Sequence, residues 1–385
     1  MDAPTLDETI RPFTLNVPQA ELDRLRAKLD LARWPEAETG TGWAQGVPLE
    51  RAKSLVEYWR TNYDWRRCEA MLNGFGQYVT MLDGLDIHFL HVQSRHADAM
   101  PLIMTHGWPG SVIEFHKVIA PLTDPTSFGG EASDAFHLVL PSLPGYGFSA
   151  KPSAPGWSVE RIAAAWAELM KRLGYARYVA QGGDWGAAVT TTLAALKPAG
   201  LAAAHMNIVS ARPKSLPREH ATEEEQRALD AMERYQRSEI GYAMIQATRP
   251  QTLGYALADS PVGQAMWIYE KFRFWTDCDG EPENVLTRDE MLDDVMLYWL
   301  TNASTSSARL YWESLFRQRH LEVDLPVGFS VFPKELFLSP RHWATEVFRD
   351  IRYWNELPRG GHFAAFEQPG LFVEELRACF RQFRP

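Results

Sequence analysis

The stretch "VAQGGDWGAAV", Val179–Val189, joins a short apolar run to a helix-forming tract through a tight turn. Glycines stand two residues before and two residues after Asp184, at Gly182 and Gly186. This spacing is typical of a nucleophile elbow, a strained turn that presents a reactive side chain between a strand and a helix. The usual nucleophile there is serine, yet no G-x-S-x-G occurs anywhere in the chain. Taken alone, the turn leaves a second interpretation open, in which Asp184 is only the N-cap of the helix.

Short apolar runs alternate with helical tracts on both sides of this turn. A hairpin is predicted over residues 76–92, where Asp83 and Gly84 favour a type I′ turn. Six further strand-like runs follow, at residues 101–106, 136–142, 177–182, 201–209, 326–336 and 350–357. Strands that alternate with helices predict a parallel sheet covered on both faces. We therefore expect an α/β fold with an eight-stranded, mostly parallel sheet whose opening hairpin adds an antiparallel edge.

The strand–helix rhythm is absent from two parts of the chain. Near the N-terminus, Leu22, Leu25 and Leu29 lie on one face of a predicted helix, which therefore needs an apolar surface to cover. In the second part, a capping box at Thr222 and Glu225 opens a helical and aromatic insertion. The predicted division is a helical lead-in over residues 1–75, a core over 76–212 and 323–385, and a helical lid over 213–322.

Composition excludes several classes of function. The formal net charge is -10 and no basic run stands out, which argues against nucleic acid or an acidic membrane surface as a partner. Cys68, Cys278 and Cys379 show neither a CxxC motif nor a metal-ligand spacing, so we interpret them as free thiols in a reducing, cytoplasmic compartment. The acidic N-terminal segment has no apolar core, and no run of about 18 apolar residues occurs, so neither a signal peptide nor a membrane anchor is expected.

A carboxylate nucleophile needs a base for the second half of its reaction, and His362 in "RGGHFAAFEQP" is the candidate. It follows the last strand signal, in the order nucleophile, acid, histidine that accompanies such elbows. The acid should follow the preceding strand, and the first carboxylate after "VGFSVF" is Glu335. Asp324 and Asp350 are the rival acids, but both precede strand signals.

A third motif, "THGWPGS" at residues 105–111, follows the predicted strand "PLIMT". In folds built around a nucleophile elbow, this loop supplies one backbone N–H to an oxyanion hole, and the residue after the nucleophile supplies the other. These donors fall on Trp108 and Trp185. Alone, "HGWPG" is a tight turn, and its register with the elbow is what gives it a functional meaning.

Together these motifs resemble the epoxide hydrolases of the α/β-hydrolase superfamily, specifically the microsomal-type branch with an N-terminal helical lead-in. The resemblance covers essentially the whole chain. It rests on "PFTLNVPQAELDRLRAKLDLARWP", "THGWPGS", "PSLPGYGFS", "GGDWG", "ATRPQTLGYALADSPVG", "SSARLYWES", "VFPKELF" and "RGGHFAAFEQP". Membrane-bound members carry an apolar anchor before the lead-in, and because this chain starts at the lead-in, the resemblance implies a soluble form.

The resemblance implies a role for each candidate residue. Asp184 is the nucleophile, His362 the base and Glu335 the acid that orients the base. Two lid tyrosines, Tyr242 in a "GYxxxQ…RP" context and Tyr311 in "SS-x-R-x-Y", bind the epoxide oxygen. The implied reactants are a small apolar epoxide and water, and no metal or organic cofactor is required. A homodimer is left open.

The nearest alternative is a haloalkane dehalogenase, which also uses an aspartate on this elbow. In that reading Trp185 would donate its indole N–H to a halide, but such enzymes lack the paired lid tyrosines and the lead-in. A non-catalytic protein of the same fold would show a broken triad, and a serine esterase would need the missing serine. Each of these alternatives is disfavoured by the same motifs.

Overall fold

A computed structural model describes residues 9–209, 211, 218–317 and 321–384, and it centres on one twisted sheet of nine strands. The sheet has the order β1-β2-β3-β5-β4-β6-β7-β8-β9. The strands are β1 Arg11–Pro12, β2 Gln77–Leu82, β3 Leu85–Val92, β4 Met100–Thr105, β5 Phe136–Pro141, β6 Tyr178–Gly182, β7 Leu201–Met206, β8 Val327–Val331 and β9 Ile351–Glu356.

Eight of these strands, β2 to β9, match the predicted runs, but the predicted count of eight is wrong by one. The ninth, β1, has only two residues and pairs antiparallel with β2 at the edge of the sheet. It is too short to show a period-two pattern, and its two residues, Arg11 and Pro12, have no strand-like composition. The hairpin is confirmed: Asp83 and Gly84 join β2 to β3 with φ angles of 48° and 80°, as a type I′ turn requires.

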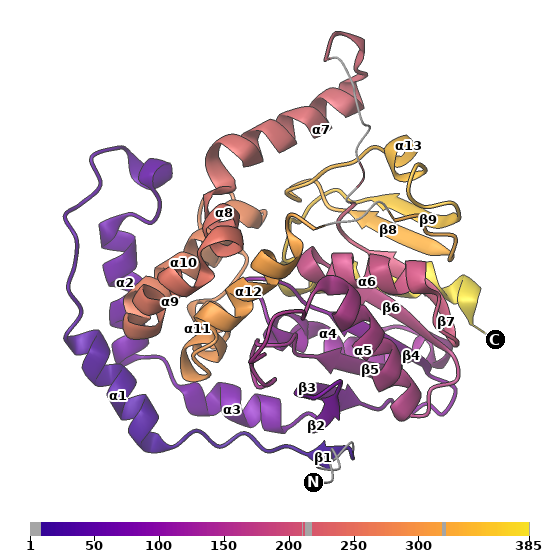
Figure 1. The fold of residues 1–385 in the computed structure, drawn as a ribbon, viewed down its shortest axis with the longest axis horizontal. Helices are drawn as coiled ribbons and strands as arrows, with labels where there is room; N and C mark the ends of the chain where they lie inside the picture. Colours follow the sequence, from indigo (N-terminus) through magenta and orange to yellow (C-terminus); the bar gives the residue numbers. More distant parts are fainter. Residues whose placement is uncertain (1–8, 210, 212–217, 318–320, 385) are drawn as a thin grey trace.

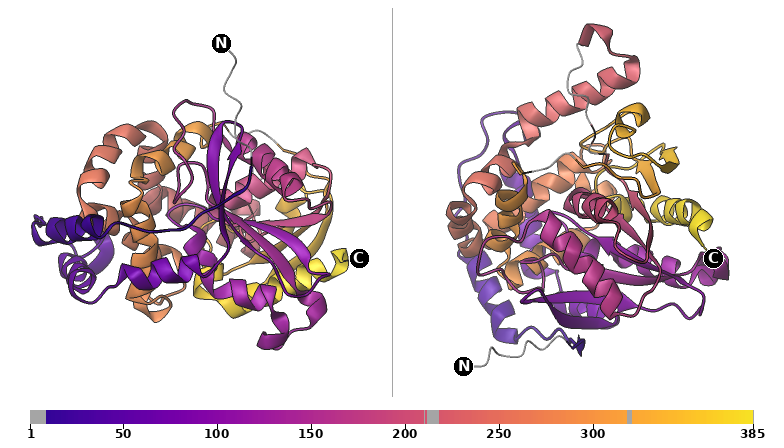
Figure 2. Two further views of the ribbon diagram at one scale, coloured as in Figure 1. Left: turned by 90° about the horizontal axis from the view of Figure 1, so that it is seen from below. Right: turned by 45° about the vertical axis from the view of Figure 1, so that its right-hand side comes forward.

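The central strands are parallel from β5 through β9 in sheet order, and the side chains of β4 to β8 are buried almost throughout, whereas those of the edge strand β9 are partly exposed. Continuous apolar sequence allows this, because helices cover both faces of the sheet. The helices are α1 Gln19–Asp30, α2 Leu49–Thr61, α3 Trp65–Asn73, α4 His116–Thr123, α5 Val159–Arg172, α6 Asp184–Leu196, α7 Glu223–Arg234, α8 Gly241–Thr248, α9 Pro250–Asp259, α10 Pro261–Trp275, α11 Arg288–Leu300, α12 Ser304–Ser314, α13 Arg341–Ala344, α14 Ala364–Glu367 and α15 Pro369–Phe380. Figure 2 shows α4 and α15 on the opposite side of the sheet from α5 and α6.

Helices α7 to α12, here called the lid helices, lie above the carboxyl ends of the parallel strands, and helices α1 to α3, the lead-in helices, lie along their outer side (Figure 1). Helix α1 buries Leu22, Leu25 and Leu29, as their spacing predicts, and it contacts α10. The capping box of α7 at Thr222 and Glu225 is also confirmed. The boundaries between lead-in, core and lid remain predictions, and the one at 212/213 falls outside the described residues.

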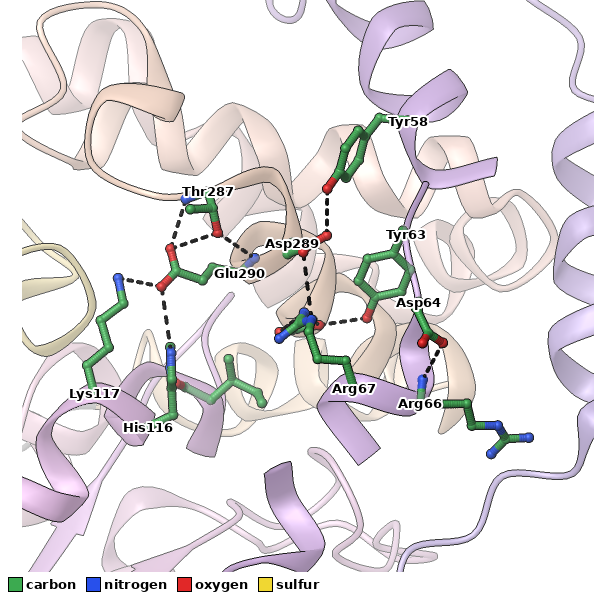
Figure 3. Close-up of polar contacts among 12 residues, drawn as sticks. Tyr58, Tyr63, Asp64, Arg66, Arg67, His116, Lys117, Thr287, Asp289 and Glu290 are labelled. Carbon is green, nitrogen blue, oxygen red and sulfur yellow. Dashed lines mark hydrogen bonds and ion pairs between the residues drawn. The ribbon is translucent and has the colours of Figure 1, made fainter. Parts of the chain in front are cut away.

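Polar contacts join the lead-in to lid helix α11 (Figure 3). The Tyr58 hydroxyl donates to Asp289 at 2.9 Å, and Arg67 binds buried Asp293 through its Nη2 at 2.6 Å. The same helix reaches the core, since Lys117 of α4 pairs with Glu290 at 2.6 Å. Helix α11 is therefore held from two sides, which fixes its position above the sheet.

The three cysteines are buried and unpaired, in agreement with their interpretation as free thiols. None of the described helices is both long and apolar enough to cross a membrane. Over the same part of the chain, no group of three or more His, Cys, Asp or Glu side chains is arranged to hold a metal ion.

Candidate active site

The turn between β6 and α6 has the geometry of a nucleophile elbow. Asp184 adopts a φ of 49°, a left-handed conformation that is rare and strained for a residue with a side chain. The flanking glycines are sterically required, because a Cβ on Gly182 would overlap the carbonyl of Gly186, and a Cβ on Gly186 would overlap the carbonyl of Thr105. Strand and helix approach each other more closely than any side chain at these two positions would allow.

Asp184 does not cap the helix. The N-cap residue is Gly183, and Asp184 is the first residue of α6, so the capping interpretation is wrong. Instead, the Trp108 backbone N–H donates to Oδ1 of Asp184 at 2.8 Å. Gly107 makes this approach possible, because a Cβ there would overlap the Asp184 carboxylate. The Trp185 amide, next along the chain, remains a prediction as the second donor.

His362 and Glu335 meet Asp184 from two separate loops. The Nδ1 atom of His362 lies 2.7 Å from Oε1 of Glu335, and its Nε2 atom lies 3.1 Å from Oδ2 of Asp184. The His362 and Glu335 side chains are both 2% exposed. The rival acids lie elsewhere: Asp324 pairs with Lys197 and Asp350 with Arg352. The structure therefore brings together the three residues that the motifs selected, in the predicted order.

The charge state of His362 is set by these two carboxylates. Burial alone would lower its pKa, but the charge of Glu335 and the hydrogen bonds to Asp184 and Glu335 outweigh burial. The net effect is a pKa well above the ordinary value of histidine. With both carboxylates ionised, the imidazole of His362 is therefore held as a cation between them.

Tyr242 of α8 and Tyr311 of α12 lie over the elbow with their rings 5.7 Å apart. Trp108 stacks on Tyr242 at 4.8 Å, and Trp185 meets Tyr311 edge-on at 4.8 Å. The Tyr311 hydroxyl is buried and has no hydrogen bond of good geometry within the described residues, but the Tyr242 hydroxyl lies close enough to donate weakly to it. Burial raises the pKa of both phenols well above the ordinary value, so both remain protonated donors at neutral pH.

A third tyrosine in the lid was not predicted from the sequence. Tyr235 begins a π-helical turn, Tyr235–Glu239, between α7 and α8, and its hydroxyl lies 3.3 Å from that of Tyr242. Tyr235 and Tyr242 are seven residues apart, a spacing that places two residues on one face of a regular α-helix, and the π-helical turn lies between them. No signal in the sequence marks this insertion.

A small cavity lies beside the Asp184 carboxylate, on the side of the "HGWPG" loop. Its polar lining includes Asp184, His362, Glu114, Gln181 and Asn207. The last three were also missed by the sequence analysis. Gln181 donates to Asn207 at 2.9 Å, while its own Oε1 is buried and has no partner among the residues that the structure describes. The sequence offered one signal for Gln181, because it is a polar residue in the buried and otherwise apolar strand β6.

Comparison with known proteins agrees with this geometry. Residues 10–115 match the family described as "Epoxide hydrolase N terminus", and residues 100–234 match "alpha/beta hydrolase fold". The chain is 60% identical over 376 residues to a Stigmatella aurantiaca protein assigned as an epoxide hydrolase, covering 97% of this chain and 86% of the relative. It is 36% identical to epoxide hydrolase 1 of Sus scrofa, covering 96% and 88% of the two chains.

Solved structures give the same result. The Aspergillus niger epoxide hydrolase superposes with a TM-score of 0.88 at 33% identity, covering 98% of this chain and 97% of the other. This match extends over the sheet, the lid helices and the lead-in helices, and it confirms the predicted fold class apart from the extra edge strand. The chain belongs to the microsomal-type epoxide hydrolases of the α/β-hydrolase fold.

Proposed function

We propose that this epoxide hydrolase converts an apolar epoxide and water to a vicinal diol through a covalent ester on Asp184. One observation carries the proposal: the ring of His362 joins Glu335 at 2.7 Å to Asp184 at 3.1 Å. A carboxylate with a base on one oxygen and a backbone donor on the other can act first as nucleophile and then as an ester to be hydrolysed.

In the first step, Oδ2 of Asp184 attacks an epoxide carbon and the strained carbon–oxygen bond breaks. The departing oxygen takes a proton from one of the two lid phenols, Tyr242 or Tyr311, and the other phenol donates a hydrogen bond to the resulting tyrosinate. An unassisted alkoxide would be too basic to leave, so a positioned acid is needed here. The raised pKa of both tyrosines supports this role, because both carry their protons before the reaction.

In the second step, His362 no longer faces an ionised Asp184, so it first releases its proton to solvent and takes one back at the end of the cycle. A water molecule then gives a proton to Nε2 of His362, and the resulting hydroxide adds to the ester carbonyl of Asp184. The Trp108 N–H stabilises the oxyanion at Oδ1, with the Trp185 N–H as the proposed second donor. The ester carbon–oxygen bond then breaks, and the diol oxygen takes the proton held by His362. Asp184 is left as a neutral acid, and its proton returns to the tyrosinate. The cycle needs no metal or organic cofactor.

The substrate class follows from the walls of the site. Aromatic rings of Trp108, Trp185, Tyr242, Tyr311 and Trp275 surround the position above Asp184. Such a surface favours an apolar epoxide with aryl or alkyl substituents. The haloalkane dehalogenase alternative is not favoured, since the matched relatives are epoxide hydrolases. A cytoplasmic location and a homodimer remain predictions from the sequence.

Isotope labelling tests the ester. A single turnover with excess enzyme in ¹⁸O-water should place the label in the peptide that contains Asp184, and the first diol should be unlabelled. The labelled enzyme should then pass ¹⁸O to diol in ordinary water. Mass spectrometry of peptide and diol measures both. If the first diol already carries the label, water attacks the epoxide directly and the proposal is wrong.

A further inference from the structure

Glu114 is a partly buried acid that has no role in the proposed reaction. It lies in the short 3-10 helix η2, Val112–Phe115, directly after the "HGWPG" loop. Its carboxyl oxygen occupies the space that a side chain on Gly110 would fill. The loop thus carries two glycines with the same function, because Gly107 admits the carboxyl group of Asp184 and Gly110 admits that of Glu114. Because both positions are glycine, two carboxyl groups can lie close to one cavity.

The size of the cavity beside Asp184 limits what it can hold. It has room for on the order of one water molecule. An ordered water needs two to four polar partners, and the walls offer Glu114, His362, Asp184 and Asn207. An epoxide with substituents does not fit here, and the lid tyrosines are not part of this lining.

The charges around Glu114 favour its neutral form. Burial raises the pKa of Glu114 well above its ordinary value, and repulsion from Asp294, when that group is ionised, and from Asp184 acts in the same direction. The positive charge of His362 and a hydrogen bond from the Ser111 backbone act to lower this pKa, but the net shift is upward. A neutral carboxyl group has one O–H to donate and a carbonyl oxygen to accept, so it can hold a water in a fixed orientation.

Asp294 is itself held in place. It lies on α11, the helix that the lead-in and Lys117 fix from two sides (Figure 3), and its Oδ1 accepts from the Ser111 hydroxyl at 2.6 Å. On the same helix, Tyr298 donates its hydroxyl to the carbonyl of Gly110 at 2.8 Å. Lid helix α11 therefore holds the loop segment that positions Glu114.

We propose that Glu114 positions the attacking water of the second step, holding it in this cavity between Asp184 and His362. The inference rests on the proposed covalent mechanism. Glu114 neither gains nor loses a proton in the cycle, since the proton of the water goes to His362. It orients the water so that one hydrogen points to Nε2 of His362 and the oxygen faces the carbonyl carbon of the ester.

The experiment separates the two half-reactions. Wild type, Glu114→Leu and Glu114→Gln are mixed in excess with styrene oxide, quenched at intervals, and assayed by mass spectrometry for ester and diol. Glu114→Leu should form the ester at the wild-type rate but hydrolyse it roughly tenfold more slowly, as expected for one lost hydrogen bond to the water. Glu114→Gln keeps a donor and an acceptor and should restore hydrolysis to within about threefold of wild type. Glu367→Gln is the matched control, because Glu367 is a buried acid that lies against Gly361, next to His362, and does not line the cavity.

The outcomes are distinguishable. No ester in the wild-type enzyme would refute the proposed function itself. An ester that Glu114→Leu hydrolyses at the wild-type rate, or equal slowing of both half-reactions, would overturn the role of Glu114 alone. Should Glu114→Leu not fold, Glu114→Asp withdraws the carboxyl group by one methylene and should slow hydrolysis selectively. An unchanged hydrolysis rate in Glu114→Asp would then overturn the inference.

Discussion

Replacing Asp294 by asparagine tests how a buried acid affects the stability of the lid helices. Asp294 is fully buried, and while Oδ1 accepts from the Ser111 hydroxyl, Oδ2 has no partner within the described residues. Burial raises the pKa of Asp294 from 3.8 to about 8, and the negative charge of Asp293 adds to this, against the hydrogen bond from Ser111. Asparagine imitates the neutral acid, because its amide oxygen can accept the same hydrogen bond.

The direction of the effect follows from the raised pKa. A carboxyl group with a higher pKa in the folded state contributes its stability below the unfolded pKa, and that contribution is lost as the pH rises toward the folded pKa. The wild type therefore loses stability between pH 3.8 and pH 8. The Asp294→Asn variant does not show this loss, because asparagine carries no titratable group. At 1.36 kcal/mol per pKa unit, the advantage of the variant should grow by about 4 kcal/mol between pH 5 and pH 8.

Urea unfolding of both proteins at several pH values measures this difference. Asp324→Asn is the control, since the Asp324 side chain is 66% exposed and its ion pair with Lys197 lies at the surface, where such a pair contributes little to stability. Epoxide turnover by Asp294→Asn should stay near wild type at pH 7, because the bond to Ser111 is kept. A constant difference between variant and wild type from pH 5 to pH 8 would refute the conclusion that Asp294 is neutral in the folded protein.

Three further predictions concern the reaction. The rate of ester hydrolysis should fall at acid pH as His362 is protonated. Glu335→Gln should move this fall to lower pH, because it removes a charge that raises the pKa of His362. A rate that stays constant down to about pH 5 in single-turnover assays would contradict the role of His362 as the base. Tyr242→Phe and Tyr311→Phe should each slow ester formation by about 10- to 100-fold while leaving ester hydrolysis unchanged, and quenched-flow ester yields distinguish the two. Gly186→Ala should abolish ester formation, because the new Cβ would overlap a strand carbonyl; an active variant would show that the elbow can relax.

The sequence was sufficient to predict that Asp184, His362 and Glu335 lie together, because a local feature places each of them. The elbow needs glycines at fixed positions around Asp184, and a parallel sheet brings the loops after its strands to one edge, so Glu335 and His362 could be placed from strand order alone. Tyr242 and Tyr311 came only from the resemblance, since nothing in periodicity distinguishes them among thirteen tyrosines.

The residues that were missed depend on long-range packing. Glu114 follows a recognised motif, but its contact with the cavity depends on a gap left by Gly110 and on helix α11, far away in sequence. Tyr235 lies at helical spacing from Tyr242, but it begins a π-helical turn, which no spacing rule marks. Strand β1 has two residues and gains its structure from pairing with β2, so its own composition carries no signal.

The contact between His362 and Asp184 explains how one residue serves both half-reactions of the proposed mechanism. In the free enzyme, ionised Asp184 raises the pKa of His362, and the imidazolium favours the carboxylate that must attack. Ester formation removes the charge on Asp184, so one cause of the raised pKa disappears while Glu335 remains. His362 then loses its proton more readily and becomes a base at the moment when a base is needed. The nucleophile thus controls the base through its own charge, and the same 3.1 Å contact supports opposite protonation states before and after the ester forms.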